Sequence, residues 1–132
     1  MIVVDLPFPP SVNRLWRAGR RRVFRSPEYL SWIAEANGCW MQQKPKLKIK
    51  SIQGHYAVTI IVHRPDNRRR DIGNLEKVLS DLAQAVGIIE DDYLCARQVK
   101  EYGTESMAPL GIRLVFESVR VSTDWVILPK AD

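Results

Sequence analysis

Two acidic groups contain the residues best suited to chemistry. The first is Asp71, which follows a run of arginines at 68–70, and the second is the triplet Glu90, Asp91 and Asp92. An aspartate at a helix start beside arginines is expected to be ionised. Ionised carboxylates suit Mg²⁺, a hard cation that takes oxygen ligands and is usually held by one or two carboxylates with phosphate and water. These residues therefore provide the parts for binding a phosphodiester and activating water.

Each acidic group also has a plainer interpretation. Asp71 is a residue type that often caps a helix N-terminus. The triplet at 90–92 also suits a solvated turn. One helix separates the two groups, so a chain reversal after Gly87 is expected to bring them together near one edge of a sheet. Taken singly, neither group decides between a metal site and ordinary structure.

The helix between the two groups offers a possible catalytic cation. Its apolar residues between 72 and 86 fall on one stripe of a helical wheel. Asn74, Lys77 and Asp81 share a polar flank beside that stripe, and Glu76 lies further around. From this flank Lys77 can reach a phosphate or a developing oxyanion. The alternative is a surface ion pair between Lys77 and Asp81 at four-residue spacing.

The other segments predict an α/β chain with a mixed sheet packed against helices. Strands are expected at 2–6, 56–63, 95–102 and 110–117, and a basic loop or twisted hairpin with a turn at Gly19 at 13–25. Ser26 and Pro27 begin a helix that extends to about Gln42. We assign Leu30, Ile33, Ala34 and Trp40 to its apolar side. Lysines alternate along 44–50, which is expected to be an exposed connection.

Composition limits the classes of protein and partner. The 132 residues are expected to form one domain over 1–132, with a tail at 118–132 that is either interfacial or flexible. A formal net charge of +5 is typical of polyanion binders, although charge alone is weak evidence. Cys39 and Cys95 form neither a disulfide framework nor a zinc motif. No signal peptide or membrane-spanning stretch is recognised, so we expect a cytoplasmic protein without membrane partners.

One longer pattern joins these residues. The segment Arg68-Arg69-Arg70-Asp71-Ile72-Gly73-Asn74-Leu75-Glu76-Lys77 is followed by Asp81, Gly87 and Asp91-Asp92. Near the start lies Leu6-Pro7-Phe8-Pro9-Pro10-Ser11-Val12-Asn13-Arg14, and His63-Arg64-Pro65-Asp66 precedes the arginines. In order and spacing, this pattern resembles the RusA family of Holliday-junction resolvases from phage and prophage.

The resemblance implies a fold, a reaction and a partner. It implies a homodimer of α/β subunits that binds four-way junction DNA in recombination and repair. The reaction implied is paired nicking with Mg²⁺, for which Mn²⁺ substitutes, without any other small-molecule cofactor. The cytoplasm of a bacterial or phage-infected cell is the expected location. A general phosphodiesterase or RNA nuclease is disfavoured only by this resemblance.

The resemblance also assigns residues. Asp71 and Asp92 match metal-binding aspartates, Asp91 precedes the second of them, and Lys77 matches a lysine that assists catalysis. The residues expected to contact DNA are Asn13, Arg14, Arg17, Arg20, Arg21, Arg22, Arg68, Arg69, Arg70 and Asn74.

One position departs from the family pattern. Gly73 stands where the family usually has the middle aspartate of Asp-x-Asp-Asn. Glu76, one helical turn further on, is our preferred replacement ligand, and Glu90 is the other candidate. The remaining alternative is a junction-binding protein with weakened or absent catalysis.

Overall fold

The centre of the molecule is a mixed four-stranded sheet. The computed structural model describes residues 1–10, 16–18, 23–64 and 75–128. The strands are β1 (Ile2–Pro7), β4 (Tyr56–Val62), β5 (Cys95–Tyr102) and β6 (Gly111–Ser118), in the order β1-β6-β4-β5. β6 is antiparallel to both β1 and β4, whereas β4 and β5 are parallel. The predicted α/β class is confirmed.

The parallel pair determines where the acidic triplet lies. Parallel neighbours need a crossover, usually a helix, and here the connection includes α2 (Leu75–Ala85). A short 3-10 helix, η3 (Asp92–Leu94), then leads directly into β5. Because β5 is an edge strand, the triplet at 90–92 sits at the edge of the sheet, at the end where β5 begins.

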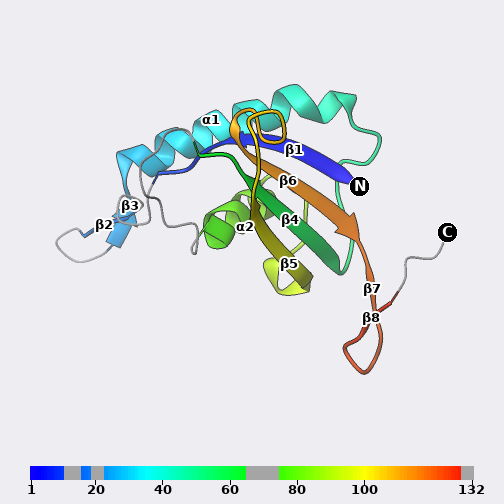
Figure 1. Ribbon diagram of the computed structural model, residues 1–132. Coiled ribbons are helices and arrows are strands. Elements are labelled where there is room, and N and C mark those ends of the chain that lie inside the picture. The colour runs from blue at the N-terminus through cyan, green and yellow to red at the C-terminus, as the bar shows by residue number, and fades with distance from the viewer. Residues whose placement is uncertain (11–15, 19–22, 65–74, 129–132) are drawn as a thin grey trace.

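Both α-helices pack on one side of the sheet (Figure 1). Alternate residues of β6, namely Ile112, Leu114 and Phe116, are at most 2% exposed and join the core. The apolar stripe predicted for α2 is confirmed over the described part of that helix, since Leu75, Val78, Leu79 and Leu82 are all buried. The start predicted at residue 72 lies outside the described residues.

The buried side of α1 (Pro27–Gln43) differs from our prediction. Ser26 caps the helix as expected, because its hydroxyl accepts a hydrogen bond of 3.1 Å from the amide of Tyr29. However, Leu30 is 52% exposed and Ala34 is also exposed, so the assignment of these two to the apolar side was wrong. The buried residues are Tyr29, Trp32, Ala36 and Trp40. Three bulky aromatic residues bury more area than Leu30 and Ala34, and so determine which side faces the sheet.

The end of α1 contacts the outer edge of β1. The side-chain amide of Gln43 accepts a hydrogen bond from the backbone amide of Asp5 and donates one to its carbonyl oxygen, both at 2.8 Å. The side chain of Asp5 forms an ion pair with Arg113 of β6, in which Nε of Arg113 donates to Oδ1 of Asp5 at 2.8 Å. This ion pair raises the pKa of Arg113.

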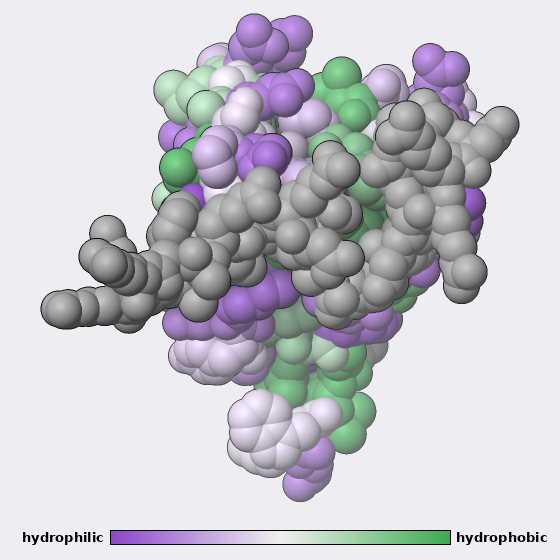
Figure 2. Space-filling view, turned by 90° about the vertical axis from the view of Figure 1, so that its left-hand side faces the viewer, coloured by the Kyte–Doolittle hydropathy of each residue, from purple (hydrophilic) through white to green (hydrophobic). Residues whose placement is uncertain are grey.

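Two small hairpins extend from this body. β2 (Trp16–Ala18) pairs with β3 (Val23–Arg25), which is the hairpin of the two alternatives predicted for 13–25, while Gly19 lies outside the described residues. β7 (Arg120–Val121) pairs with β8 (Ile127–Leu128) within the predicted tail. This second hairpin projects from one end of the molecule in both Figure 1 and Figure 2. Trp125 at its turn is 79% exposed. No described helix has the length and apolar character needed to cross a bilayer.

Candidate functional site

The end of α2 directs the chain into the acidic turn. Gly87 has a φ of 84°, a left-handed conformation in which glycine avoids the cost of a Cβ. Its amide donates to the carbonyl oxygen of Gln84 at 3.2 Å, and that of Ile88 donates to the carbonyl oxygen of Ala83 at 2.9 Å. This pair of bonds is a Schellman motif. Gly87 is therefore the helix C-cap that the sequence predicts.

Hydrogen bonds hold the acidic turn, residues 90–92, against two neighbouring segments. Glu90 accepts a hydrogen bond from the amide of Gly54, in the loop before β4. Asp91 caps η3 through a 3.3 Å bond from the amide of Tyr93 to its Oδ1. The amide of Asp92 donates to Gln84 Oε1 of α2, also at 3.3 Å. The position of the turn is thus fixed by α2 on one side and by the loop at 51–55 on the other.

Lys77 connects α2 to the turn. Its Nζ lies 3.0 Å from Asp81 Oδ1 and 3.6 Å from Asp92 Oδ2. The hydrogen bond with Asp81, followed by the charges of Asp81 and Asp92, raises the pKa of Lys77, so the ammonium remains charged near neutral pH. The surface pair that we considered as an alternative is present, and it also leaves Lys77 beside Asp92. The two interpretations of Lys77 are therefore compatible.

A buried tyrosine lies next to the turn. Tyr56, at the start of β4, is 1% exposed, and burial is the main cause of its raised pKa. Cys95 and the carboxylates of Asp92 and Asp91 raise this pKa further. The acidic turn therefore acts electrostatically on a neutral phenol, and Tyr56 remains protonated at any pH near neutrality.

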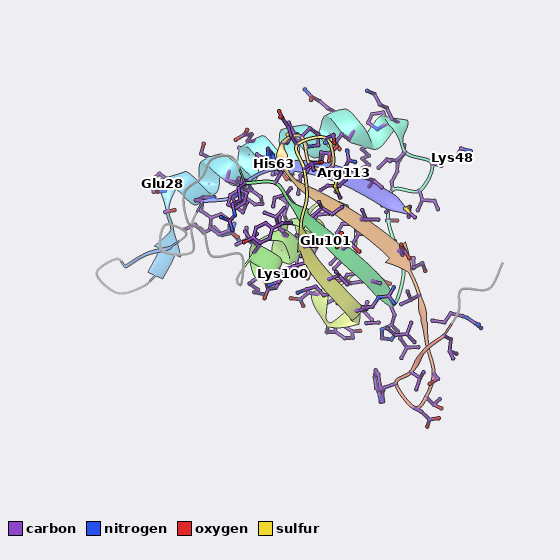
Figure 3. The ribbon with its side chains drawn as sticks, in the orientation of Figure 1. Glu28, Lys48, His63, Lys100, Glu101 and Arg113 are labelled. Atoms are coloured by element: carbon purple, nitrogen blue, oxygen red, sulfur yellow. The ribbon has the colours of Figure 1, made fainter. Side chains whose placement is uncertain are left out.

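Glu76 points toward β5. Its Oε2 lies 2.9 Å from Nζ of Lys100, and both side chains are about one quarter to one third exposed, at 34% and 23%. Figure 3 labels Lys100 on β5, close to α2. One carboxylate oxygen of Glu76 thus has a cationic partner. Glu90, the other candidate ligand, is bonded to Gly54.

Several predicted site residues lie outside the described residues. These are Asp71, Gly73, Asn74, Asn13, Arg14, Arg20, Arg21, Arg22, Arg68, Arg69 and Arg70. Arg17 lies in β2, of which only the backbone is described. Within the described part of the chain, no three His, Cys, Asp or Glu side chains cluster closely enough to hold a metal ion. The described part of the candidate site is thus Lys77 and the acidic turn, while Glu76 precedes Lys77 on α2 and contacts Lys100.

Sequence reasoning missed Gln84, whose side chain bonds the backbone of Asp92. Gln84 follows Lys77 by seven residues, or two helical turns, and so lies on the same side of α2. This spacing was the available signal. The hydrogen bond from Gly54 to Glu90 has no counterpart in the sequence, because it joins segments 36 residues apart.

Comparison with known proteins identifies the family. Residues 7–114, which include α2, the acidic turn and β5, match the family model described as endodeoxyribonuclease RusA. The chain belongs to the RusA family. A crossover junction endodeoxyribonuclease RusA from Aquifex aeolicus is 35% identical over 67% of this chain and 68% of its own length. The relative from Enterobacteria phage HK97, of the same description, is 32% identical over 66% of this chain and 70% of its own.

A third RusA relative covers more of the chain. The crossover junction endodeoxyribonuclease RusA of Escherichia coli strain K12 is 33% identical over 79% of this chain and 81% of its own length. The resemblance that we drew from the motifs is therefore confirmed at the level of the family. The roles of individual residues remain predictions.

Proposed function

We propose that this RusA-family protein is a structure-specific endonuclease that resolves Holliday junctions by metal-dependent hydrolysis of paired phosphodiester bonds. The family match and the names of the relatives support the substrate. The observation that carries the chemistry is the 3.6 Å approach of Lys77 Nζ to Asp92 Oδ2, which joins two separately predicted segments. The ammonium can bind a phosphate oxygen directly, whereas the exposed carboxylate would hold the same phosphate only through a metal ion.

The acidic residues fit Mg²⁺ or Mn²⁺ as the metal. Asp92 is 40% exposed on its side chain and offers the oxygen donors that such a hard cation prefers. Its partner in our proposal is Asp71. Asp91 or Glu76 then completes the set of metal ligands, because Gly73 lacks the carboxylate that the family has at that position. When bound, the metal supplies positive charge to the phosphate and lowers the pKa of a water ligand.

Lys77 and Asp81 have complementary roles in this proposal. Lys77 binds a non-bridging phosphate oxygen and stabilises the negative charge that develops as the bond breaks. Asp81 is the nearer partner of Lys77, at 3.0 Å against 3.6 Å for Asp92. Asp81 would therefore keep the ammonium oriented toward the turn while Asp92 holds the metal. This makes Asp81 a positioning residue.

DNA binding and symmetry complete the proposal. Arg14, Arg17 and the arginines at 20–22 and 68–70 hold the phosphate backbone, assisted by Asn13 and Asn74. Such contacts position the substrate and weaken as salt increases. A homodimer with twofold symmetry presents two equivalent sites to two strands of like polarity, which explains paired cuts.

Cleavage of a synthetic four-way junction tests this function. We expect symmetric nicks in two opposing strands with Mg²⁺ or Mn²⁺, none with a chelator, and little cutting of a linear duplex of the same sequence. An RNA duplex serves as a further competitor. Equal cleavage of junction, linear duplex and RNA would show a general phosphodiesterase instead.

Gly73 motivates a second candidate function, which is junction binding without cleavage. This alternative predicts tight, salt-sensitive binding and no nicks with either metal. The substitution Gly73→Asp then separates the two cases. Activity gained only in Gly73→Asp would indicate a lost ligand, whereas activity already present in the unaltered protein indicates a replaced one.

A further inference from the structure

A second basic surface lies far along the chain from the predicted DNA-binding arginines. The segment between α1 and β4 carries Lys44, Lys46, Lys48 and Lys50, which we call the lysine segment. Its first three residues form the 3-10 helix η2 (Lys44–Lys46). The side chains at 46, 48 and 50 are exposed. Figure 3 shows Lys48 pointing outward from the loop, away from the sheet.

The cations of the lysine segment differ from most others in the described chain. Arg113 pairs with Asp5, Lys100 with Glu76, and Lys77 with two aspartates. Arg25 and Arg64 lie over the rings of Tyr29 and Tyr102. No carboxylate among the described residues lies within ion-pair distance of the four lysines. Their charge is therefore available to an external anion.

The chain anchors this surface instead of leaving it loose. Leu47 packs against the core from within the segment, and Ile52, just beyond it, is 5% exposed. Lys44 and Lys46 also follow the C-terminal end of α1, where a cation interacts favourably with the helix dipole. That is an ordinary structural role. That effect falls off within the last turn, so it gives no account of Lys48 or Lys50.

The lysine segment leads directly to the acidic turn. The amide of Ile52 donates to the carbonyl oxygen of Ile88 at 2.8 Å, and Ile52 forms an isolated parallel bridge with Ile89. From the residue rise and strand spacing, the Cα atoms of Lys50 and Asp92 are at most about 23 Å apart. Duplex DNA carries one charge per roughly 1.7 Å of axis, so an arm that passes both regions presents phosphates along the whole distance between them.

This surface is also separate from the β2–β3 hairpin. The hairpin precedes the first residue of α1, and the lysine segment follows its last. α1 has 17 residues, which corresponds to a length of about 25 Å. Figure 1 shows the two regions at opposite ends of this helix. One phosphate group cannot contact both, so the two regions must meet different parts of a DNA backbone.

We propose that the lysine segment is a phosphate-backbone contact that holds a DNA arm leading away from the acidic turn. The proposal rests on the DNA-binding function proposed above and adds a binding site to it. The contacts are with phosphate oxygens only, so they stabilise binding without reading sequence. Among the described residues no ion pair joins these lysines to the carboxylates of the acidic turn, so the contact contributes to affinity and not to the chemical step.

Junction binding without metal provides the test, because it separates binding from cleavage. The triple variant K46Q/K48Q/K50Q is compared with the unaltered protein by fluorescence anisotropy over a range of salt concentrations. Each lost phosphate contact lowers the slope of log K against log salt by about 0.9. We expect the slope to fall by about two or more, with affinity about 10- to 100-fold weaker at physiological salt.

Two control variants make the comparison specific. K46R/K48R/K50R keeps the charge and is expected to retain the slope. Arg97→Gln removes another exposed cation without a described acidic partner, on β5, and is expected to change affinity less than twofold. If the triple glutamine variant folds poorly in circular dichroism, the single reversal Lys48→Glu replaces it, with an expected loss of at least threefold.

The outcomes separate this inference from the proposed function. If the unaltered protein binds and cuts the junction but a folded lysine variant keeps the original slope, the lysine contact is wrong and the nuclease function stands. If the unaltered protein does not bind the junction, both proposals fail. A slope reduced by Arg97→Gln by the same amount per removed charge would show general charge attraction in place of a defined contact.

Discussion

The acidic turn and the lysine segment lie on either side of one backbone bridge, between Ile52 and Ile89, yet they are built differently. In the turn each carboxylate has a described partner: Glu90 has Gly54, Asp91 has Tyr93, and Asp92 has Lys77. The lysine segment is anchored through Leu47, while its charged ends have no described acidic partner. Catalysis requires a fixed geometry of the reacting groups, whereas contacts with a DNA backbone tolerate variation in side-chain position. This difference predicts that substitutions in the two regions affect different measurements.

The largest effect is expected for Asp92→Asn, which removes the charge of a proposed metal ligand while keeping the shape of the side chain. Cleavage of a four-way junction should fall by about 1,000-fold or more, by analogy with loss of a key electrostatic group. Metal-free junction binding should remain within a fewfold of the original. Asp124→Asn, an exposed aspartate in the β7–β8 hairpin, serves as the matched control and should cleave normally. If Asp92→Asn lost binding and cleavage equally, the acidic turn and the lysine segment would not differ in the step that they affect.

Lys77→Met should give the next largest effect, about 100-fold on the cleavage rate under single-turnover conditions. The methionine keeps the side-chain length without the charge that faces Asp92 and Asp81. Lys77→Arg retains the charge and should recover part of the rate. If Lys77→Met instead weakens binding but cleaves bound junctions at the original rate, Lys77 functions like the lysine segment and is not a catalytic residue.

Glu76 and Lys100 should give a smaller effect, measured as the Mg²⁺ concentration that gives half-maximal cleavage. If Glu76 replaces the ligand missing at Gly73, Glu76→Gln should raise this concentration by about tenfold. Lys100→Met removes the competing cation at 2.9 Å and should leave the concentration unchanged or lower it. Equal increases in both variants would show that Glu76 only supports the ion pair between α2 and β5.

The smallest effect concerns the position of the turn. Gly87→Ala places a side chain at a φ of 84°, which costs about 1–2 kcal/mol of unfolding free energy. Urea denaturation measures this loss, and cleavage of the folded protein should fall only fewfold. Gly38→Ala, in a helix where a Cβ meets no neighbour within 4 Å, is the contrasting control and should stabilise the protein. If Gly87→Ala has the same free energy of unfolding as the unaltered protein, this cap does not fix the turn.

Much of this molecule can be predicted from its sequence, because many of its signals are local. The apolar stripe of α2, the cap at Ser26 and the alternation along β6 each depend on neighbours within a few residues. The buried side of α1 could not be chosen in the same way. Leu30 and Tyr29 are both apolar enough to be buried, and only packing against the sheet selects Tyr29.

The candidate site shows the same limit. The motif predicts Lys77 and Asp92 as partners in one site, and the structure brings them to 3.6 Å. By contrast, the bond between Glu76 and Lys100 joins residues 24 positions apart and depends on β5 lying next to β4. No local pattern predicts that neighbour. The motif therefore predicts Glu76 as a candidate ligand but does not predict its contact with Lys100.

The amide of Gln43 has a consequence for how the sheet could grow. By bonding both the N–H and the C=O of Asp5, it takes the place that an added strand would fill at the outer edge of β1. Exposed strand edges are templates for unwanted association between chains. The opposite edge is formed by β5, for which no further strand partner is described. Gln43 thus blocks strand addition at Asp5, whereas the described residues place no further strand against the β5 border.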